Sequence, residues 1–242
     1  MSEPLLDNPR AFMEKVAAAL GGTAAAQPGL SGFVNSKFDR FFNQLFASAG
    51  VAPRDAVAAL ERRPGFVWLA EKPNADELGA DGLWLLEMYG MTATTALPTE
   101  QRRPEGEIGE VRSRDDFDGW FGVYSEVFGA DPKGRDEWHR VYDALGPSGD
   151  GSLLLLLARA GGSPAATGAT FFHDGLAGLY CFTTLEQMRA RGLASALVLA
   201  SHETARERGF GRAVLHATAS GRPVYAKAGY REVRSLPVLV SP

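Results

Sequence analysis

Apolar and polar residues alternate with strand or helix spacing through most of the chain, most regularly in its second half. Strands are predicted at 108–111, 153–159, 165–172, 178–184, 213–217 and 230–240, and helices at 113–128, 136–145, 192–208 and 222–228. The gaps between the three middle strands are the length of hairpin loops. This order predicts an α/β protein with a mixed sheet and helices on both faces.

The first half is less regular. Helices are predicted at 9–20, 53–63 and 75–89, and strands at 66–70 and 91–97, with Asn8 as the cap of the first helix. Residues 33–46 fit either a helix or two short strands, and periodicity does not decide between them. The charged, proline-bearing segment 98–106 predicts a linker. We therefore expect one domain at 1–105 and a second at 106–242.

A weak internal repeat connects the two halves. The order strand, helix, glycine, strand occurs in both, and placing Gly90 on Gly229 aligns them. The first half has no counterpart of residues 189–194, so a real repeat would have lost its chemistry in the N-terminal copy. Chance similarity is the alternative.

Composition narrows the class of protein. The 242 residues are 45% hydrophobic and 22% charged, with a net charge of -4, so there is no basic excess to bind nucleic acid. The longest apolar run, 153–158, is too short to span a membrane, and the N-terminus lacks a signal-peptide pattern. We expect a cytoplasmic protein.

Cysteine and histidine usage argues against metals. The single cysteine, Cys181, excludes an internal disulfide and a cysteine-based zinc site. The four histidines show no metal-binding spacing. We expect no metal cofactor.

The most informative segment joins the strand at 179–184 to the helix that begins near Gly192. A strand, a turn with a glycine and a helix N-terminus together form an anion cradle of backbone N–H groups. The cradle residues are Arg189, Ala190, Arg191, Gly192, Leu193, Ala194 and Ser195. Neither GxGxxG nor GxxxxGK[ST] occurs, which disfavours a nucleotide-binding domain. The cradle is predicted to bind the pyrophosphate of a coenzyme.

Two motifs in order resemble those of the GCN5-related N-acetyltransferase (GNAT) family. Arg189, Gly192 and Ala194 match its coenzyme signature, and Tyr225, Gly229 and Tyr230 match its later signature. The resemblance covers about 111–233. It implies a GNAT-like, mostly antiparallel mixed sheet, as a pseudo-tandem whose N-terminal half is degenerate.

The resemblance also implies an activity: transfer of an acetyl group from acetyl-CoA, as cosubstrate, to a primary amine of a small molecule or peptide. By position, Phe182, Thr183 and Thr184 would hydrogen-bond the pantetheine arm, and Thr218 would touch the coenzyme. A backbone N–H of that strand would polarise the thioester carbonyl. Tyr225 would be the general acid that protonates the leaving thiolate.

The general base is the gap in this assignment. Family members often carry a carboxylate on the fourth strand, but residues 179–183 contain none. Glu126, His173, Glu186 and a water molecule remain as candidates. The missing carboxylate motivates an alternative function, a non-catalytic acyl-CoA-binding or sensing module. The acceptor amine and the oligomeric state have no signal in the sequence.

Overall fold

The structure is a computed structural model that describes residues 4–74, 83–96 and 106–241. Its first half contains α1 (Pro4–Leu20), β1 (Thr23–Ala24), β2 (Leu30–Val34), η1 (Arg40–Phe42), β3 (Asn43–Ala47), α2 (Pro53–Ala58), β4 (Gly65–Trp68) and β5 (Trp84–Thr94). Its second half contains β6 (Glu107–Glu110), α3 (Arg114–Phe128), η3 (Pro132–Gly134), α4 (Arg135–Leu145), β7 (Leu153–Ala160), β8 (Ser163–His173), β9 (Leu176–Thr184), η4 (Glu186–Met188), α5 (Leu193–Glu207), β10 (Arg212–Ala217), α6 (Arg222–Lys227) and β11 (Arg231–Ser241).

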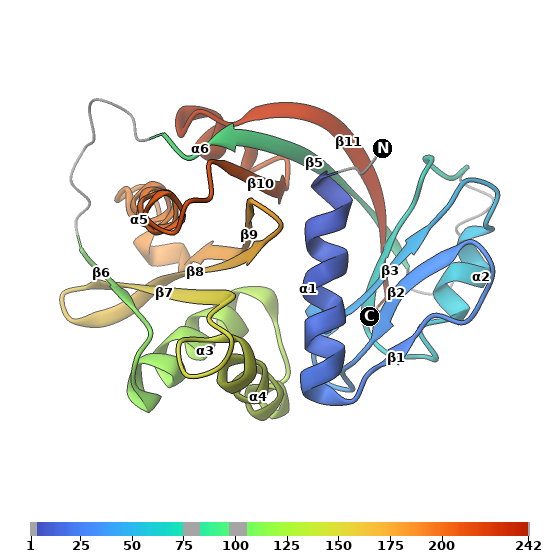
Figure 1. Ribbon diagram of the computed structural model, residues 1–242, viewed down its shortest axis with the longest axis horizontal. Coiled ribbons are helices and arrows are strands. Elements are labelled where there is room, and N and C mark those ends of the chain that lie inside the picture. Colours follow the sequence, from blue (N-terminus) through green and yellow to red (C-terminus); the bar gives the residue numbers. More distant parts are fainter. Residues whose placement is uncertain (1–3, 75–82, 97–105, 242) are drawn as a thin grey trace.

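One mixed sheet runs through the described residues. Its eleven strands lie in the order β1-β2-β3-β4-β11-β5-β10-β9-β8-β7-β6. The pairs β3–β4 and β9–β10 are parallel and the others are antiparallel. Helices α1, α3 and α4 cover one face, and α2 and α5 cover the other (Figure 1). The predicted fold class is confirmed.

The two halves of the chain exchange their last strands. β5, from the first half, lies between β10 and β11, whereas β11 pairs with β4 of the first half. Figure 1 shows β5 and β11 as the long strands that connect the two sides of the molecule. The sheet is therefore continuous across the expected domain boundary. That boundary stays a prediction, and the linker expected at 98–106 falls almost entirely outside the described residues.

The helix predicted at 75–89 is wrong for its described part, because residues 84–89 belong to β5. The reason is tertiary: pairing of residues 84–89 with β11 overrides a weak local preference for helix. The alignment of Gly90 with Gly229 is also wrong, since Gly90 lies mid-strand opposite His216 and Arg234. The repetition that the structure does contain is hairpin, helix, parallel strand: β2-β3-α2-β4 and β8-β9-α5-β10.

Residues 33–46 are neither of the two predicted forms alone, because β2 ends there, η1 follows and β3 begins. The first helix begins at Pro4, so Asn8 lies inside α1 and does not cap it. Asn8 is instead buried against the sheet, where its Oδ1 accepts a hydrogen bond from the Tyr180 hydroxyl at 2.6 Å. Ser113 caps α3, as its side chain accepts from the Asp116 N–H.

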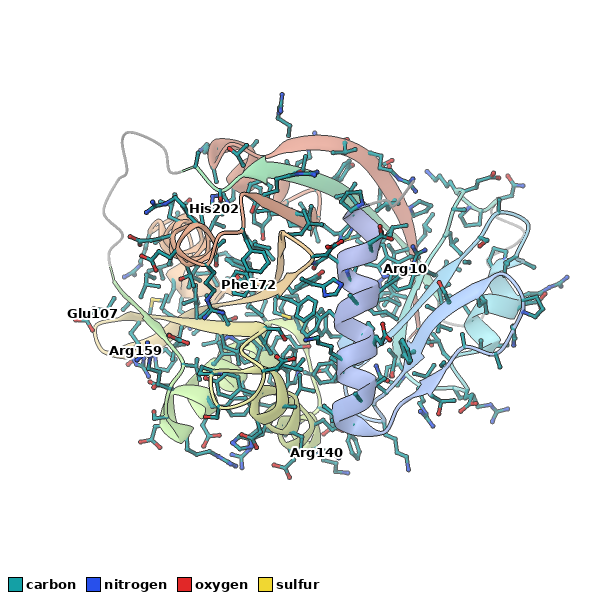
Figure 2. All side chains as sticks on the ribbon, viewed as in Figure 1. Arg10, Glu107, Arg140, Arg159, Phe172 and His202 are labelled. Carbon is teal, nitrogen blue, oxygen red and sulfur yellow. The ribbon has the colours of Figure 1, made fainter. Side chains whose placement is uncertain are left out.

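The core forms on both faces of the sheet. On the α3 and α4 face, aromatic residues dominate, with Trp120 and Trp138 fully buried and Phe12 of α1 stacked on Phe171 at 4.7 Å between ring centroids. On the α5 face the cluster is mainly aliphatic and includes Phe172 and Tyr230. Figure 2 shows Phe172 and His202 in the packed interior, and Arg10 on the side of α1 that faces β3.

Candidate active site

The parallel strands β9 and β10 separate at one end. Their pairing runs from Leu176 opposite Arg212 to Leu179 opposite Leu215 and then stops. From Tyr180 to Thr184, β9 pairs with β8 alone among the described strands. The other edge of this segment therefore presents backbone hydrogen-bonding groups to an opening, where an extended amide-bearing chain could add as a further strand.

A β-bulge lies at the point where the two strands separate. Tyr180 pairs with Ala169 and Thr183 with Thr167, so Cys181 and Phe182 together oppose the single residue Gly168. Cys181 has a left-handed φ of 55°. Because a bulge redirects the side chains around it, Cys181 packs against the α3 and α4 core while Phe182 packs against the α5 core.

The predicted cradle follows directly after this strand. Ala190 and Gly192 have left-handed φ values of 63° and 81°, and Arg191 lies between them. The first main-chain bond of α5 runs from Ala196 N to Gly192 O at 3.0 Å. The N–H groups of Leu193, Ala194 and Ser195 precede it and have no partner within the helix, and Gly192 makes no side-chain cap.

This backbone is a nest of N–H groups at the positive end of a 15-residue helix. Arg189 and Arg191 are exposed beside it. The sequence did not foresee that Ala190 is left-handed. The arrangement suits an anion, and the pyrophosphate of a coenzyme has the negative charge and the acceptor oxygens that such N–H groups bind.

Tyr225 lies on α6, on the α5 side of the opening. Its ring meets Tyr230 edge to face at 5.8 Å, and Tyr230 shares a 2.8 Å hydrogen bond with Nε2 of the buried His202. Burial raises the pKa of Tyr225 well above its ordinary value, and the nearby Cys181 thiol raises it further. Tyr225 is therefore protonated throughout the physiological range, close to the bulge of β9.

The remaining predicted coenzyme contacts lie around the same opening. Thr183 and Thr184 end β9, and the Thr184 Oγ1 is buried with no hydrogen-bond partner among the described residues. Thr218 follows β10, where its hydroxyl accepts a bond from the Gly221 N–H at 3.2 Å at the start of α6. A buried hydroxyl without a partner is costly, so Thr184 fits a site that a polar ligand fills.

The candidate bases are scattered. His173 is exposed at the end of β8, opposite Leu176 of β9. Leu176 is five residues, or about 16 Å, from Cys181 along the strand. Glu126 is exposed on α3, and Glu186 is exposed in η4 just after β9. Burial, then the charge of Asp39, raises the pKa of the Cys181 thiol, which makes it a poor nucleophile.

The sequence missed a buried carboxylate beside this centre. Asp39, from the connection between β2 and η1, is 1% exposed and hydrogen-bonded to Tyr124 of α3 and Trp138 of α4. No motif marks it, because its partners lie far away in the sequence and only the fold assembles them.

Two further findings concern metals and membranes. In the described ranges, no group of three or more histidine, cysteine, aspartate or glutamate residues is arranged to hold a metal ion. Within the same ranges, none of the helices combines the length and the apolar character needed to cross a membrane.

Comparisons with known proteins were made for the sequence and for the structure. Residues 116–230 match the model of the acetyltransferase (GNAT) family. No curated protein matches the sequence.

Solved structures resemble nearly the whole chain. A functionally unknown conserved protein from Staphylococcus epidermidis has a TM-score of 0.67 at 14% identity, covering 92% of this chain and 94% of its own. A GCN5-related N-acetyltransferase from Kribbella flavida has a TM-score of 0.65 at 18% identity, covering 97% and 95%. A putative GNAT acetyltransferase from Novosphingobium aromaticivorans has a TM-score of 0.62 at 18% identity, covering 99% of both chains. At these identities the likeness establishes the fold.

Proposed function

We propose that the chain, whose residues 116–230 match the GNAT acetyltransferase family, transfers an acetyl group from acetyl-CoA to a primary amine of a small molecule or peptide. This proposal rests on three features that lie around one opening in the sheet. The open edge of β9, the N–H nest before α5 and the protonated Tyr225 all surround the separation of β9 and β10. We expect the protein to work in the cytoplasm.

Each part of acetyl-CoA has a suitable partner in this opening. The N–H groups from Ala190 to Ser195 would bind the pyrophosphate, with Arg189 and Arg191 adding positive charge at the surface. The amides of the pantetheine arm would pair with Phe182, Thr183 and Thr184 as an additional strand. The unpartnered Thr184 hydroxyl supports this placement, and Thr218 would contact the coenzyme from the end of β10.

The chain's own groups would then serve the transfer. When bound, acetyl-CoA supplies an activated acetyl thioester. A backbone N–H at the bulge of β9 would stabilise negative charge that develops on the carbonyl oxygen. Tyr225 would donate its proton to the departing sulfur. Burial keeps this phenol protonated but makes it a weaker acid, so its effect depends on direct contact with the sulfur as charge forms there.

Replacing Tyr225 with phenylalanine is expected to lower kcat by about 10²- to 10⁴-fold, the usual worth of a positioned proton donor. The dissociation constant for acetyl-CoA should not change, because the phenol acts only as charge develops on sulfur. Thiol release across a panel of primary amines measures the first quantity, and calorimetry the second.

Tyr142→Phe is the matched control, since Tyr142 lies on α4, away from the opening, and its hydroxyl donates to the Val111 carbonyl. Equal losses in both variants would contradict the acid role. Acetyl-CoA binding without thiol release for any amine would instead favour the non-catalytic sensing module. If acetyl-CoA at about 100 times a micromolar Kd failed to add the expected stability of about 2.7 kcal/mol, coenzyme binding at that affinity would be refuted.

A further inference from the structure

A cavity of about 470 Å³ opens between the two halves of the chain, on the α3 and α4 side of the sheet. It is lined by residues 37–40 and Pro64 from the first half, and by Tyr124 and residues 128–132 from the second. This volume suits a small organic molecule. Three of the lining side chains are aromatic, namely Phe38, Tyr124 and Phe128.

Asp39 is the buried charged group of this cavity. Its Oδ1 accepts from the Phe41 N–H at 2.9 Å, its Oδ2 accepts from Trp138 Nε1 at 2.7 Å, and the Tyr124 hydroxyl lies 3.0 Å and 2.9 Å from the two oxygens. These are three donor protons for a carboxylate with about four acceptor positions. One position remains for a ligand.

Asp39 makes no ion pair within the described part of the chain. The neighbouring Arg40 guanidinium lies 5.6 Å from the centroid of the Trp84 ring. Buried carboxylates are costly unless a cation pairs with them. Lys37 and Arg40 also line the cavity, and the charge of Arg40 acts on Asp39 without an ion pair between them. A buried carboxylate that has no ion pair, beside a cavity with three aromatic side chains, is suited to a cationic ligand. The Lys133 ammonium, 5.9 Å from the Phe38 ring, already uses one of these walls in this way.

Asp39 also lies close to the bulge of β9. The Phe41 N–H donates to Asp39, and the Phe41 ring meets the Tyr180 ring of β9 edge to face at 6.0 Å between centroids. Trp120, which stacks on Tyr124 at 5.4 Å, donates to the Gly168 carbonyl opposite the bulge. Cys181 belongs to the bulge of β9, with Asp39 on the α3 and α4 side and Tyr225 on the α5 side. A nucleophile from the cavity would therefore meet the thioester from the side opposite to the proton donor for the leaving sulfur.

We propose that Asp39 binds the ammonium group of the acceptor and takes its proton, so that the N-terminal half supplies the base that β9 lacks. This inference rests on the proposed acetyl transfer. It assigns the acceptor to primary amines with a compact apolar or aromatic body, because three aromatic residues and two prolines line the cavity beside Asp39.

The acceptor enters the site with its amine protonated, as R–NH3+. One proton passes to Asp39, and the freed lone pair of nitrogen forms the C–N bond. The C–S bond breaks with its electron pair on sulfur, which takes the proton of Tyr225. The second proton of nitrogen restores the phenol, and Asp39 releases its proton to water at the cavity mouth. The products are an amide, a thiol and one free proton.

Several charged and titratable groups face Asp39 and set its pKa. Burial raises the pKa of Asp39, while the bonds from Phe41, Trp138 and Tyr124 and the charge of Arg40 lower it. Burial raises the pKa values of Glu137 of α4 and Cys181 of β9, and the charge of Asp39 raises both further. Removing the Tyr124 hydroxyl should therefore raise the pKa of Asp39.

The first test replaces Asp39 with asparagine and measures kcat/KM for 2-phenylethylamine. A loss of about 10²- to 10⁴-fold is expected, with the Kd for acetyl-CoA unchanged. Glu137→Gln is the matched control, because Glu137 is a buried carboxylate that accepts from the Ser36 hydroxyl but does not line the cavity. Equal losses in the two variants would overturn the proposal and leave Asp39 a purely structural residue.

Tyr124→Phe provides a second test that keeps the carboxylate. The acidic limb of kcat/KM against pH should move to higher pH, because the base must be ionised and has lost a stabilising donor. An unmoved limb would overturn the proposal. This readout also serves if Asp39→Asn does not fold.

Binding separates the inference from the proposed activity. Calorimetry should show that 2-phenylethylamine binds the wild-type protein at least about tenfold more tightly than 2-phenylethanol, a difference of about 1.4 kcal/mol that disappears in Asp39→Asn. Equal binding of amine and alcohol would overturn the inference even if acetyl transfer occurs. Selective amine binding without thiol release would refute the acetyl transfer and, with it, the role of Asp39 as a base.

Discussion

Gly192→Asp is expected to weaken acetyl-CoA binding by at least about a thousandfold, about 4 kcal/mol, without unfolding the protein. Aspartate tolerates the left-handed φ of 81° better than most residues do. Its carboxylate would lie at the N-terminus of α5, where a negative charge stabilises a helix. The same carboxylate would occupy the anion nest and repel the pyrophosphate. The effects on stability and on binding therefore have opposite signs, and calorimetry with thermal unfolding measures both.

Gly209→Asp is a closely matched control. Gly209 has a φ of 83° and open space around it, and it lies just past the other end of the same helix. The backbone cost is the same in both variants, but a negative charge at a helix C-terminus is unfavourable. We expect a lower Tm and unchanged acetyl-CoA binding. If both variants bind acetyl-CoA equally well, the pyrophosphate does not bind before α5.

Gly178→Ala is expected to destabilise the fold by about 3 kcal/mol, through overpacking and the loss of a buried hydrogen bond. A Cβ on Gly178 would lie 1.9 Å from Asn8 Oδ1 and 2.8 Å from Tyr180 Cε2. The alanine would therefore push α1 away from the sheet and break the bond between Tyr180 and Asn8. For a chain of this length the Tm should fall by about 6–12 °C, as thermal unfolding would reveal.

Gly109→Ala is the control, because it adds the same methyl group at a strand position with free space around it. Gly109 lies in β6, and no atom lies within 4 Å of the position that its Cβ would take. Alanine there should be neutral or stabilising by about 0.5–1 kcal/mol. Adding Asn8→Ala to Gly178→Ala should recover part of the lost stability, because the colliding oxygen is gone. Additive losses would show that α1 does not pack on the sheet at this point.

Because the two halves exchange strands, the N-terminal half contributes to the sheet around the proposed site, which its sequence does not indicate. β5 borders β10, and residues 37–40 line the cavity that we propose for the acceptor. The N-terminal half matches no coenzyme motif. Even so, by completing the sheet and one wall of the cavity, it contributes to the proposed site more than a degenerate copy would.

The sequence was sufficient where local rules dominate. The strands and helices from β6 to β11 lie within a few residues of their predictions, because each apolar run is bounded by glycine, proline or a capping residue. The nest at 189–195 is local as well, since a strand, a turn and a helix N-terminus are consecutive in the chain. The pairing of that nest with Tyr225 followed from the order of two motifs.

The sequence was insufficient where partners are distant. Residues 84–89 are a strand because they pair with β11, a neighbour that comes about 150 residues later in the chain and is not visible to local periodicity. Asp39 likewise has no motif, because its donors come from positions 124 and 138.

By itself, then, the sequence predicted the anion cradle, the tyrosine acid and the resemblance to the GNAT family, because these depend on backbone geometry and on short motifs that are local in the chain. Only the tertiary structure showed the buried carboxylate of Asp39 and the cavity beside it. The burial of Asp39, its lack of a cationic partner and the cavity beside it are properties of packing between segments that no local pattern relates.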